Sequence, residues 1–319
     1  MIDNPDIKIL FRTTTPLSGM PYRTALVCDK ALEKSGGSGW FHHIATEGYG
    51  EGAASFPVNY GNPPCDPDLL IVPSYGCPEA REYDAPVVTH YSTEHSMWSD
   101  KNPQSGSGTV VAQYQARFAP KLEVMPNCVP IDNEMFKPGE KPTDRVVILY
   151  TPSNRVESGW KTKGFRETCK ILSGIVADSR AGKLPAVEVI MLENQKYEDV
   201  LAVRRIAHIS IDECVTGSYH SVSVESMSAG CATFANIDGL TNDALVRLVG
   251  QEATDEMPLN RSTMTSLSSR LRTLIQSPML LDCICSDSRK WMEKWYSETF
   301  QAETWLNWHN NFLKTSGRG

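Results

Sequence analysis

The 319-residue sequence lacks the features that mark several large protein classes. No apolar run approaches the ~20 residues that cross a bilayer, and residues 1–6 have neither the basic nor the apolar region of a signal peptide. The nine cysteines form no CxxC pair, which argues against a structural zinc site and favours reduced thiols. The formal charge of −7 disfavours a broad nucleic-acid-binding surface. These absences predict a cytoplasmic protein with no integral membrane segment and no metal site.

Short apolar runs bounded by Pro, Gly, Asp or Ser recur along the chain and are typical of buried parallel strands. They predict strands at 7–11, 69–72, 86–90, 109–112, 122–125, 145–150, 187–192, 209–212 and 231–235. Helical periodicity predicts helices at 21–34, 164–180, 197–207, 221–229, 264–276 and 287–314. Residues 45–85 carry little helical signal. The alternation predicts an α/β protein of two doubly wound, Rossmann-like domains with a ligand cleft between them.

A polar stretch rich in Pro and Gly, residues 131–144, predicts the linker between the domains. We therefore expect an N-terminal domain over residues 1–140 and a C-terminal domain over 141–290. The remaining segment, 291–319, is expected to be a C-terminal helix.

The first candidate motif follows the predicted strand that opens the C-terminal domain. It contains Ser153, Asn154 and Arg155, and it continues through Lys163 to a helix that begins at Gly164. Loop amides, a helix N-terminus and basic side chains together favour binding of a phosphate or diphosphate. The spacing is not that of a Walker A loop. The alternative is a solvated basic loop.

The second candidate motif, residues 217–230, follows the predicted strand 209–212. A loop led by Gly217 feeds a short helix whose first turn offers N–H groups to an anion. Glu225 lies inside this otherwise small and apolar helix, and its carboxylate could accept hydrogen bonds from the two hydroxyls of a ribose. The alternative is an exposed helical glutamate.

Together the two motifs resemble the C-terminal domain of GT-B-fold glycosyltransferases of the family-4 retaining type. The family shows a "PSN…KG" loop and a later "EAM-x-x-G" helix, matched here by 152–164 and by 225–230. Segment 125–138 resembles the family's "PNGVD…F-x-P" stretch, and 286–296 resembles its late helix. The resemblance covers most of residues 120–300. It implies two domains facing across a cleft and a C-terminal helix that returns to the N-terminal domain.

The resemblance also implies roles for single residues. Lys163, and Arg155 with it, would neutralise the donor's diphosphate, and Glu225 would hold the nucleotide ribose. The Gly19 loop would approach the transferred sugar or the diphosphate. Further donor contacts would come from Ser153, Asn154, Gly217, Tyr219, His220, Ser221, Val222 and Ser223. Many relatives carry a glutamate where this sequence has Gly217, and Val156–Trp160 stretches the usual Arg–Lys spacing; both departures affect the predicted donor contacts.

A histidine near the reacting centre is also implied, in the loop after a "PVV" strand. The sequence offers His90 and His95 there, and Glu94 is a further candidate base. Each of the three could instead be an ordinary polar residue.

The predicted function is transfer of a sugar from a nucleotide-diphosphate sugar, UDP- or GDP-linked, to an acceptor hydroxyl. The resemblance implies retention of configuration, no metal and no further cofactor, which is the chemistry of a hexosyl- or pentosyltransferase. The acceptor is open: a saccharide, a small molecule or a modified DNA base. One alternative is a viral-type glycosyltransferase for hydroxymethylated pyrimidines in DNA. Others are a nucleotide-sugar epimerase and a non-catalytic protein of the same fold that serves as a binding or scaffold module.

Overall fold

The structure is a computed structural model, and it describes residues 1–14, 17–46, 59–60, 63, 65–104, 106, 108–152, 163–193 and 195–316. The chain divides into unit 1, Met1–Pro130 with Tyr296–Gly319, and unit 2, Ile131–Trp295. The divisions fall at 130/131 and 295/296, where the sequence predicts 140/141 and 290/291.

Unit 1 is built on a seven-stranded sheet in the order β3-β2-β1-β4-β5-β6-β7. All neighbouring strands are parallel except β3, which pairs antiparallel with β2. The strands are β1 (Lys8–Thr13), β2 (Trp40–Ala45), β3 (Asn59–Tyr60), β4 (Leu69–Pro73), β5 (Val87–Tyr91), β6 (Gly108–Val111) and β7 (Glu123–Met125). The five strands predicted in this part of the sequence are confirmed to within two residues at each end.

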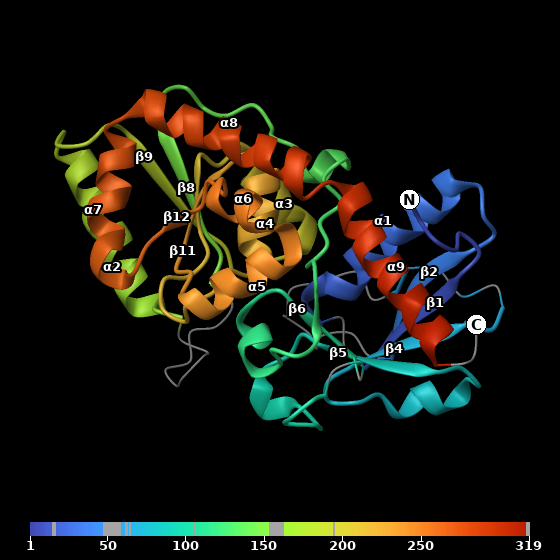
Figure 1. Cartoon of the computed structure of the whole chain (residues 1–319). Helices are drawn as coiled ribbons and strands as arrows, with labels where there is room; N and C mark the ends of the chain where they lie inside the picture. The colour runs from blue at the N-terminus through green and yellow to red at the C-terminus, as the bar shows by residue number, and fades with distance from the viewer. Residues whose placement is uncertain are drawn as a thin grey trace. The chain divides into compact units, whose positions relative to one another are not determined.

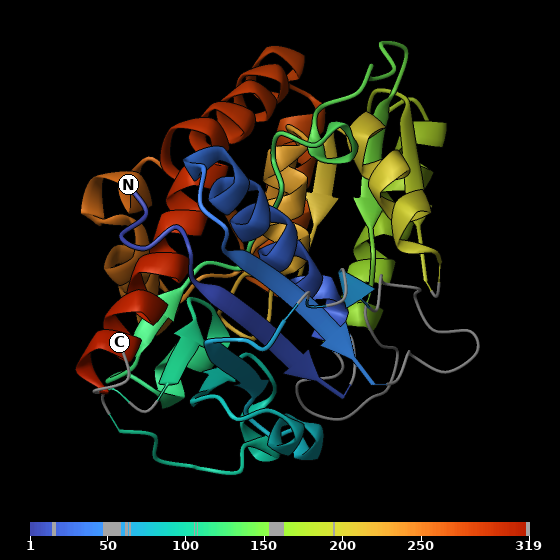
Figure 2. The same cartoon turned by 90° about the vertical axis from the view of Figure 1, so that its right-hand side faces the viewer.

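Two helices pack on one face of this sheet, α1 (Met20–Ser35) and α9 (Glu298–Thr315) (Figures 1 and 2). Pro21 lies in the first turn of α1, where its missing N–H costs no hydrogen bond. Ser297 caps α9 by accepting a hydrogen bond from the Phe300 amide. Their apolar faces enclose a core around Phe11 and Trp305. The C-terminal helix therefore belongs to the N-terminal sheet, as the resemblance implies.

The opposite face of the sheet is covered differently. A smaller core around Leu10 and Leu70 is closed by the 3-10 helix η2 (Pro78–Glu82), and no α-helix packs there among the residues that the structure describes. The other short 3-10 helices of this unit are η1 (Leu17–Gly19), η3 (His95–Met97) and η4 (Tyr114–Phe118). This agrees with the weak helical signal of residues 45–85.

Unit 2 contains a five-stranded parallel sheet in the order β12-β11-β10-β8-β9. Its strands are β8 (Val146–Tyr150), β9 (Val187–Met191), β10 (Ile209–Ile211), β11 (Ala232–Ala235) and β12 (Asn260–Arg261). The first four match the sequence-based prediction, whereas the two-residue β12 was missed because it is too short to carry a periodic pattern.

Helices cover both faces of this second sheet. One face packs against α2 (Phe165–Arg180), α7 (Met264–Ile275) and α8 (Pro278–Trp295). The other packs against α3 (Tyr197–Ile206) and the end of α4 (Ser221–Ser228). The remaining elements are η5 (Glu134–Phe136), α5 (Gly239–Val249) and α6 (Gln251–Asp255). This is the doubly wound arrangement predicted for the C-terminal domain.

One predicted helix was wrong in its extent. The periodic stretch 287–314 is two helices, since α8 ends at Trp295 and α9 starts at Glu298. Ser297, with a non-helical backbone, separates them and caps the second. None of the helices in the described part of the chain is long and apolar enough to cross a membrane.

Candidate functional site

The strand order of unit 2 brings the two predicted motifs together. From β8 the chain continues to β9 on one side, and β10 then pairs on the other side of β8, with Ile211 beside Tyr150. The loops after β8 and β10 therefore leave the sheet at its topological switch point, where open α/β sheets bind ligands. Ser153, Asn154 and Arg155 fall in segment 153–162, which lies outside the described residues.

Lys163 and Gly164 form the entry to α2 in an unusual backbone conformation. Their φ angles are 37° and 73°, both left-handed. Gly164 suits this position because a Cβ there would lie 2.8 Å from a Val215 methyl and 3.0 Å from the Met264 sulfur. A left-handed lysine costs roughly 1–2 kcal/mol, and such outliers concentrate at functional sites.

Asp212 is the buried centre of the switch point. Its Oδ2 accepts hydrogen bonds from the His220 amide and the Ser223 hydroxyl, both at 2.7 Å. Its Oδ1 lies 3.4 Å from Nδ1 of His220. Burial opposes ionisation, but His220, Lys163 and Ser223 together lower the pKa of this carboxyl below its usual value. The Lys163 charge thus acts on the same carboxylate that holds the start of α4.

Glu213, the next residue, is also buried and closes a local turn. Its carboxylate accepts hydrogen bonds from the amides of Val215 at 2.7 Å and Thr216 at 2.8 Å, and from the Thr216 hydroxyl. Its Oε1 lies 3.9 Å from Nδ1 of His220. Sequence reasoning missed both acids, although two carboxylates directly after a strand at the switch point were a usable signal.

The predicted residues of the β10–α4 loop lie together at this edge, but with different exposure. His220, Ser221 and Val222 are half-buried at the first turn of α4, while Tyr219 is 1% exposed. Burial raises the pKa of the Tyr219 phenol far above its usual value. A ligand at this surface can therefore reach His220 and the first helical turn, but not the Tyr219 ring.

Gly217 packs against Asp238, the residue that caps α5. Gly217 has φ of 81°, and a Cβ there would lie 2.4 Å from Asp238 Oδ2. Asp238 accepts a hydrogen bond from the Thr241 amide at 3.0 Å and donates its own amide to the Gly217 carbonyl at 3.1 Å. Asp238 thus places a carboxylate beside Gly217, the position for which the sequence resemblance implies a glutamate, and sequence reasoning did not find Asp238.

Gly217→Ala should lower the free energy of unfolding of unit 2 by about 2 to 4 kcal/mol, because strain at positive φ adds to overpacking against Asp238. Urea unfolding of the two proteins measures this. Gly182→Ala is the matched control, since Gly182 has φ of 73° and open space around its Cβ position. An equal loss in both variants would show that Asp238 contributes no steric constraint.

Glu225 is buried on the side of α4 that meets α3. Oε1 accepts a hydrogen bond from the Tyr197 hydroxyl at 2.7 Å, and Oε2 pairs with Nη1 of Arg204. The side chains of Glu225 and Arg204 are 4% and 2% exposed. Glu225 is therefore neither an exposed helical glutamate nor open to a ribose in this structure.

No family model and no curated protein matches the sequence. Solved structures do match the fold. AviGT4, a glycosyltransferase involved in avilamycin A biosynthesis, aligns with a TM-score of 0.53 at 14% identity over 97% of this chain and 98% of its own. Sucrose-phosphate synthase from Thermosynechococcus elongatus aligns with a TM-score of 0.55 at 10% identity, over 97% of this chain and 100% of its own.

Staphylococcus aureus TarM, solved with UDP, aligns with a TM-score of 0.52 at 11% identity over 75% of this chain, which spans about half of TarM (54%). The proteins in these matches share one architecture of two Rossmann-like domains. The chain has the GT-B fold. In this GT-B chain the cluster of Lys163, Asp212, Glu213 and His220 lies in the C-terminal Rossmann-like domain.

The remaining predicted residues of the GT-B chain lie in unit 1, and His90 is not at a surface there. It is fully buried in β5, with Nδ1 2.9 Å from the Thr109 hydroxyl and its ring 4.9 Å from that of Trp305. Burial, with a smaller effect of His309, lowers the pKa of His90 to about 3. The His90 ring is therefore closed to solvent in this structure, and its catalytic role stays a prediction.

Glu94 and His95 follow β5 and are both half-buried. The His95 ring stacks on Phe118 with centroids 4.3 Å apart and meets Trp98 edge-on. Gly19 lies at the start of α1 with φ of 72°. These three stay candidates for contacts with substrate.

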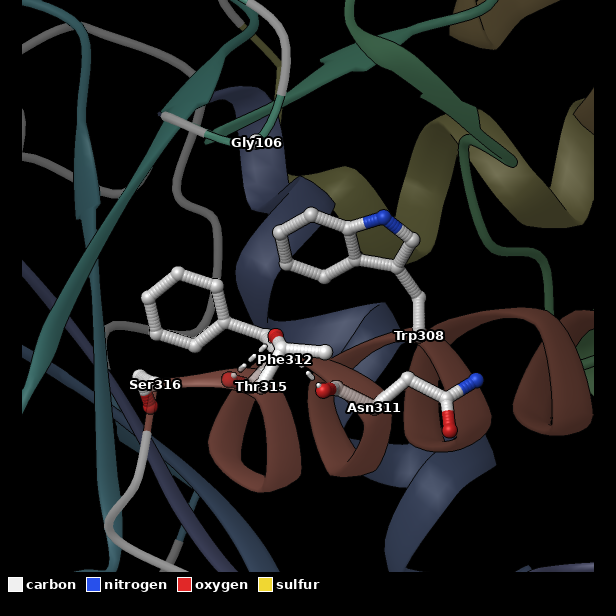
Figure 3. Close-up of a pocket in the computed structure, with 6 residues that line it drawn as sticks. All are labelled: Gly106, Trp308, Asn311, Phe312, Thr315 and Ser316. Atoms are coloured by element: carbon white, nitrogen blue, oxygen red, sulfur yellow. Dashed lines mark hydrogen bonds between the residues drawn. The ribbon is translucent and has the colours of Figure 1, made fainter.

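A surface hollow of about 380 Å³ lies on α9 of unit 1, lined by Gly106, Trp308, Asn311, Phe312, Thr315 and Ser316 (Figure 3). The Trp308 and Phe312 rings stack within it at 5.6 Å. None of the lining residues is charged, so the hollow offers nothing to a diphosphate. Within the described residues, no three His, Cys, Asp or Glu side chains are grouped so as to hold a metal ion.

Proposed function

We propose that this chain is a glycosyltransferase that moves a sugar from a nucleotide-diphosphate donor to an acceptor hydroxyl. The observation that carries the proposal is the convergence of Lys163, His220 and the first turn of α4 at the switch point of unit 2. The likeness to solved glycosyltransferases supports it. Retention of configuration, a UDP- or GDP-sugar donor and metal-independence rest on the sequence resemblance.

The charges at the switch point suit a diphosphate. Asp212 and Glu213 would repel an anion if they were exposed, but each accepts at least two hydrogen bonds from N–H or hydroxyl groups. The amides of Ser223 and Val224 in the first turn of α4 donate to the His220 carbonyl, and the N-terminus of the helix carries partial positive charge. Lys163 adds a full charge. A diphosphate bound here would be stabilised most as negative charge builds on it during bond cleavage.

The remaining steps follow from the same proposal. The donor sugar would lie near Gly217, where Asp238 supplies a carboxylate. We assign no covalent nucleophile. His95 or Glu94 of unit 1 would contact the acceptor or its proton. The ribose contact implied for Glu225 stays a prediction, since Tyr197 and Arg204 occupy its oxygens here.

The first test is a thermal-shift screen with UDP, GDP, ADP, TDP and CDP. Ligand at about 100 times its Kd stabilises the folded state by ~2.7 kcal/mol. For a protein of this size, that raises the melting temperature by a few degrees. Lys163→Ala should weaken binding by roughly tenfold to a hundredfold, because a charge-assisted contact contributes about 1.5 to 3 kcal/mol. Lys170→Ala, on the exposed side of the same helix, is the control and should leave the shift unchanged.

A shift with one nucleotide, reduced only in Lys163→Ala, would name the donor base. Turnover of the matching sugar nucleotides would follow, with the product anomer read by NMR and the rate measured with and without a chelator. An inverted product or a rate abolished by chelation would contradict the finer proposal. No shift with any nucleotide at millimolar concentration would favour a non-catalytic scaffold.

A further inference from the structure

Arg12 occupies the switch point of the other sheet, in unit 1. It is the next-to-last residue of β1, and β1 lies between β2 and β4. The chain passes from β1 to β2 on one side and later to β4 on the other. The carboxyl end of β1 is therefore the point in this sheet where ligand binding is expected.

The guanidinium of Arg12 is buried without a strong partner. The residue is 8% exposed. Among the residues that the structure describes, its one hydrogen bond runs from Nη1 to the Ile44 carbonyl and is 3.5 Å long, and Nε has no acceptor. Across the described residues, no carboxylate lies within ion-pair distance of it. A buried charge without a partner costs several kcal/mol.

Its neighbours do not supply a counter-ion. The Arg12 charge makes a small contribution to lowering the pKa of Glu79. The Glu79 carboxylate, however, accepts hydrogen bonds from its own backbone amide and, at 3.2 Å, from the Cys77 thiol. His43 is buried, and the nearby Arg12 charge adds to the burial that lowers its pKa. The surroundings therefore leave the positive charge largely uncompensated.

Two other buried arginines in the described part of the chain behave differently. Arg23, 1% exposed, donates from Nε to the Cys128 carbonyl at 2.9 Å and from Nη2 to Asn127 Oδ1 at 3.0 Å. Arg204 pairs with Glu225. Arg23 and Arg204 therefore stabilise the fold. The planar guanidinium of Arg12 has several N–H donors and no acceptor placed to bond with two of them at once.

We propose that Arg12 binds an anionic group, a carboxylate or a phosphate, on the molecule that receives the sugar. The identity of that molecule as an acceptor rests on the proposed function. The negative charge of the ligand is inferred independently, from the unpaired guanidinium at the switch point of unit 1. The acceptor would thus be an acidic hydroxyl compound, such as a sugar phosphate or a uronate, rather than a neutral sugar.

The test compares Arg12→Met with Arg23→Met in the full chain. Removing an unpaired buried charge should raise the melting temperature of ligand-free Arg12→Met, while Arg23→Met should lower it. Glucose 6-phosphate, glucuronate and inorganic phosphate should each shift wild type by a few degrees, and glucose should not. Binding of these anions should be at least tenfold weaker in Arg12→Met, while the UDP shift stays as in wild type.

The possible results separate this inference from the proposed function. A lower melting temperature in Arg12→Met, with equal anion shifts in both proteins, would make Arg12 structural and overturn the inference. Loss of the UDP shift in Arg12→Met would assign the guanidinium to the donor and overturn it as well. If anions shift wild type but not Arg12→Met while no nucleotide binds, the anion site stands and the proposed function fails.

Discussion

Glu225→Ala should lower the free energy of unfolding of unit 2 by about 3 to 5 kcal/mol. The substitution leaves Arg204 charged, 2% exposed and without its carboxylate, and it removes the hydrogen bond of the Tyr197 hydroxyl to Glu225. An uncompensated charge in the interior costs more than the pair contributed. Urea unfolding, with pulsed hydrogen exchange read on peptides from β8 and β10, measures the loss in unit 2 alone.

Two variants control this result. Tyr197→Phe removes one neutral donor and should cost about 1 kcal/mol. Glu225→Leu combined with Arg204→Met removes both charges and should recover most of the stability lost in Glu225→Ala, because apolar replacement of a buried pair is often neutral. Unchanged stability in Glu225→Ala together with lost nucleotide binding would instead support the ribose role.

This geometry also changes how the donor site should be probed. Loss of nucleotide binding in Glu225→Ala would follow from unfolding as readily as from a lost contact. Lys163 is half-buried at the entry to α2, and its removal leaves no buried partner charge alone, because His220 and Ser223 still contact Asp212. Lys163 is therefore the better probe of the donor site.

The sequence was sufficient for nine strands and most helices because their periodicities are local, whereas β2, β3 and β12 were not predicted. It also predicted that the loops after β8 and β10 lie at one edge of the sheet, since parallel strands put their carboxyl ends at the same edge. The break between α8 and α9 was missed because apolar periodicity continues across it, and Ser297 is a weak signal inside a tryptophan-rich stretch.

Side-chain partners could not be predicted, because they come from distant segments. The contacts of Glu225 lie 28 and 21 residues earlier, on α3. The burial of His90 depends on Trp305 of α9. Local signals were nevertheless present for two features that were missed: Asp212 and Glu213 follow a strand directly, and Arg12 interrupts an apolar one.

Lowering the pH from 7 to 5 should destabilise unit 1 by up to roughly 6 kcal/mol. Three of its histidines, His43, His90 and His309, are fully buried. Burial lowers the pKa to about 3 for His43 and His90 and to about 4 for His309. A neutral ring suits the contacts of His309, since its Nδ1–H donates to the Trp305 carbonyl while its Nε2 has no hydrogen-bond partner among the described residues.

The direction follows from proton uptake. A histidine in the unfolded chain titrates near pH 6.5. Below that pH the unfolded state binds protons that the folded unit excludes until about pH 4 or 3, so stability falls as the pH drops. At pH 5 each ring contributes about 2 kcal/mol to the loss. Above about pH 7 the three rings are neutral in both states and contribute no pH dependence.

Urea unfolding at pH 7 and pH 5, with pulsed exchange on peptides from β1, β4 and β5, measures the effect. His309→Gln and His90→Gln replace a titrating ring with a neutral amide. Their stabilities at pH 7 report the cost of repacking, so only the difference between the two pH values reports titration. Each variant should reduce that difference by about 2 kcal/mol. A difference as large as in wild type would mean that a charged form of the ring is accommodated within the folded unit, against the packing of Trp305 on both histidines.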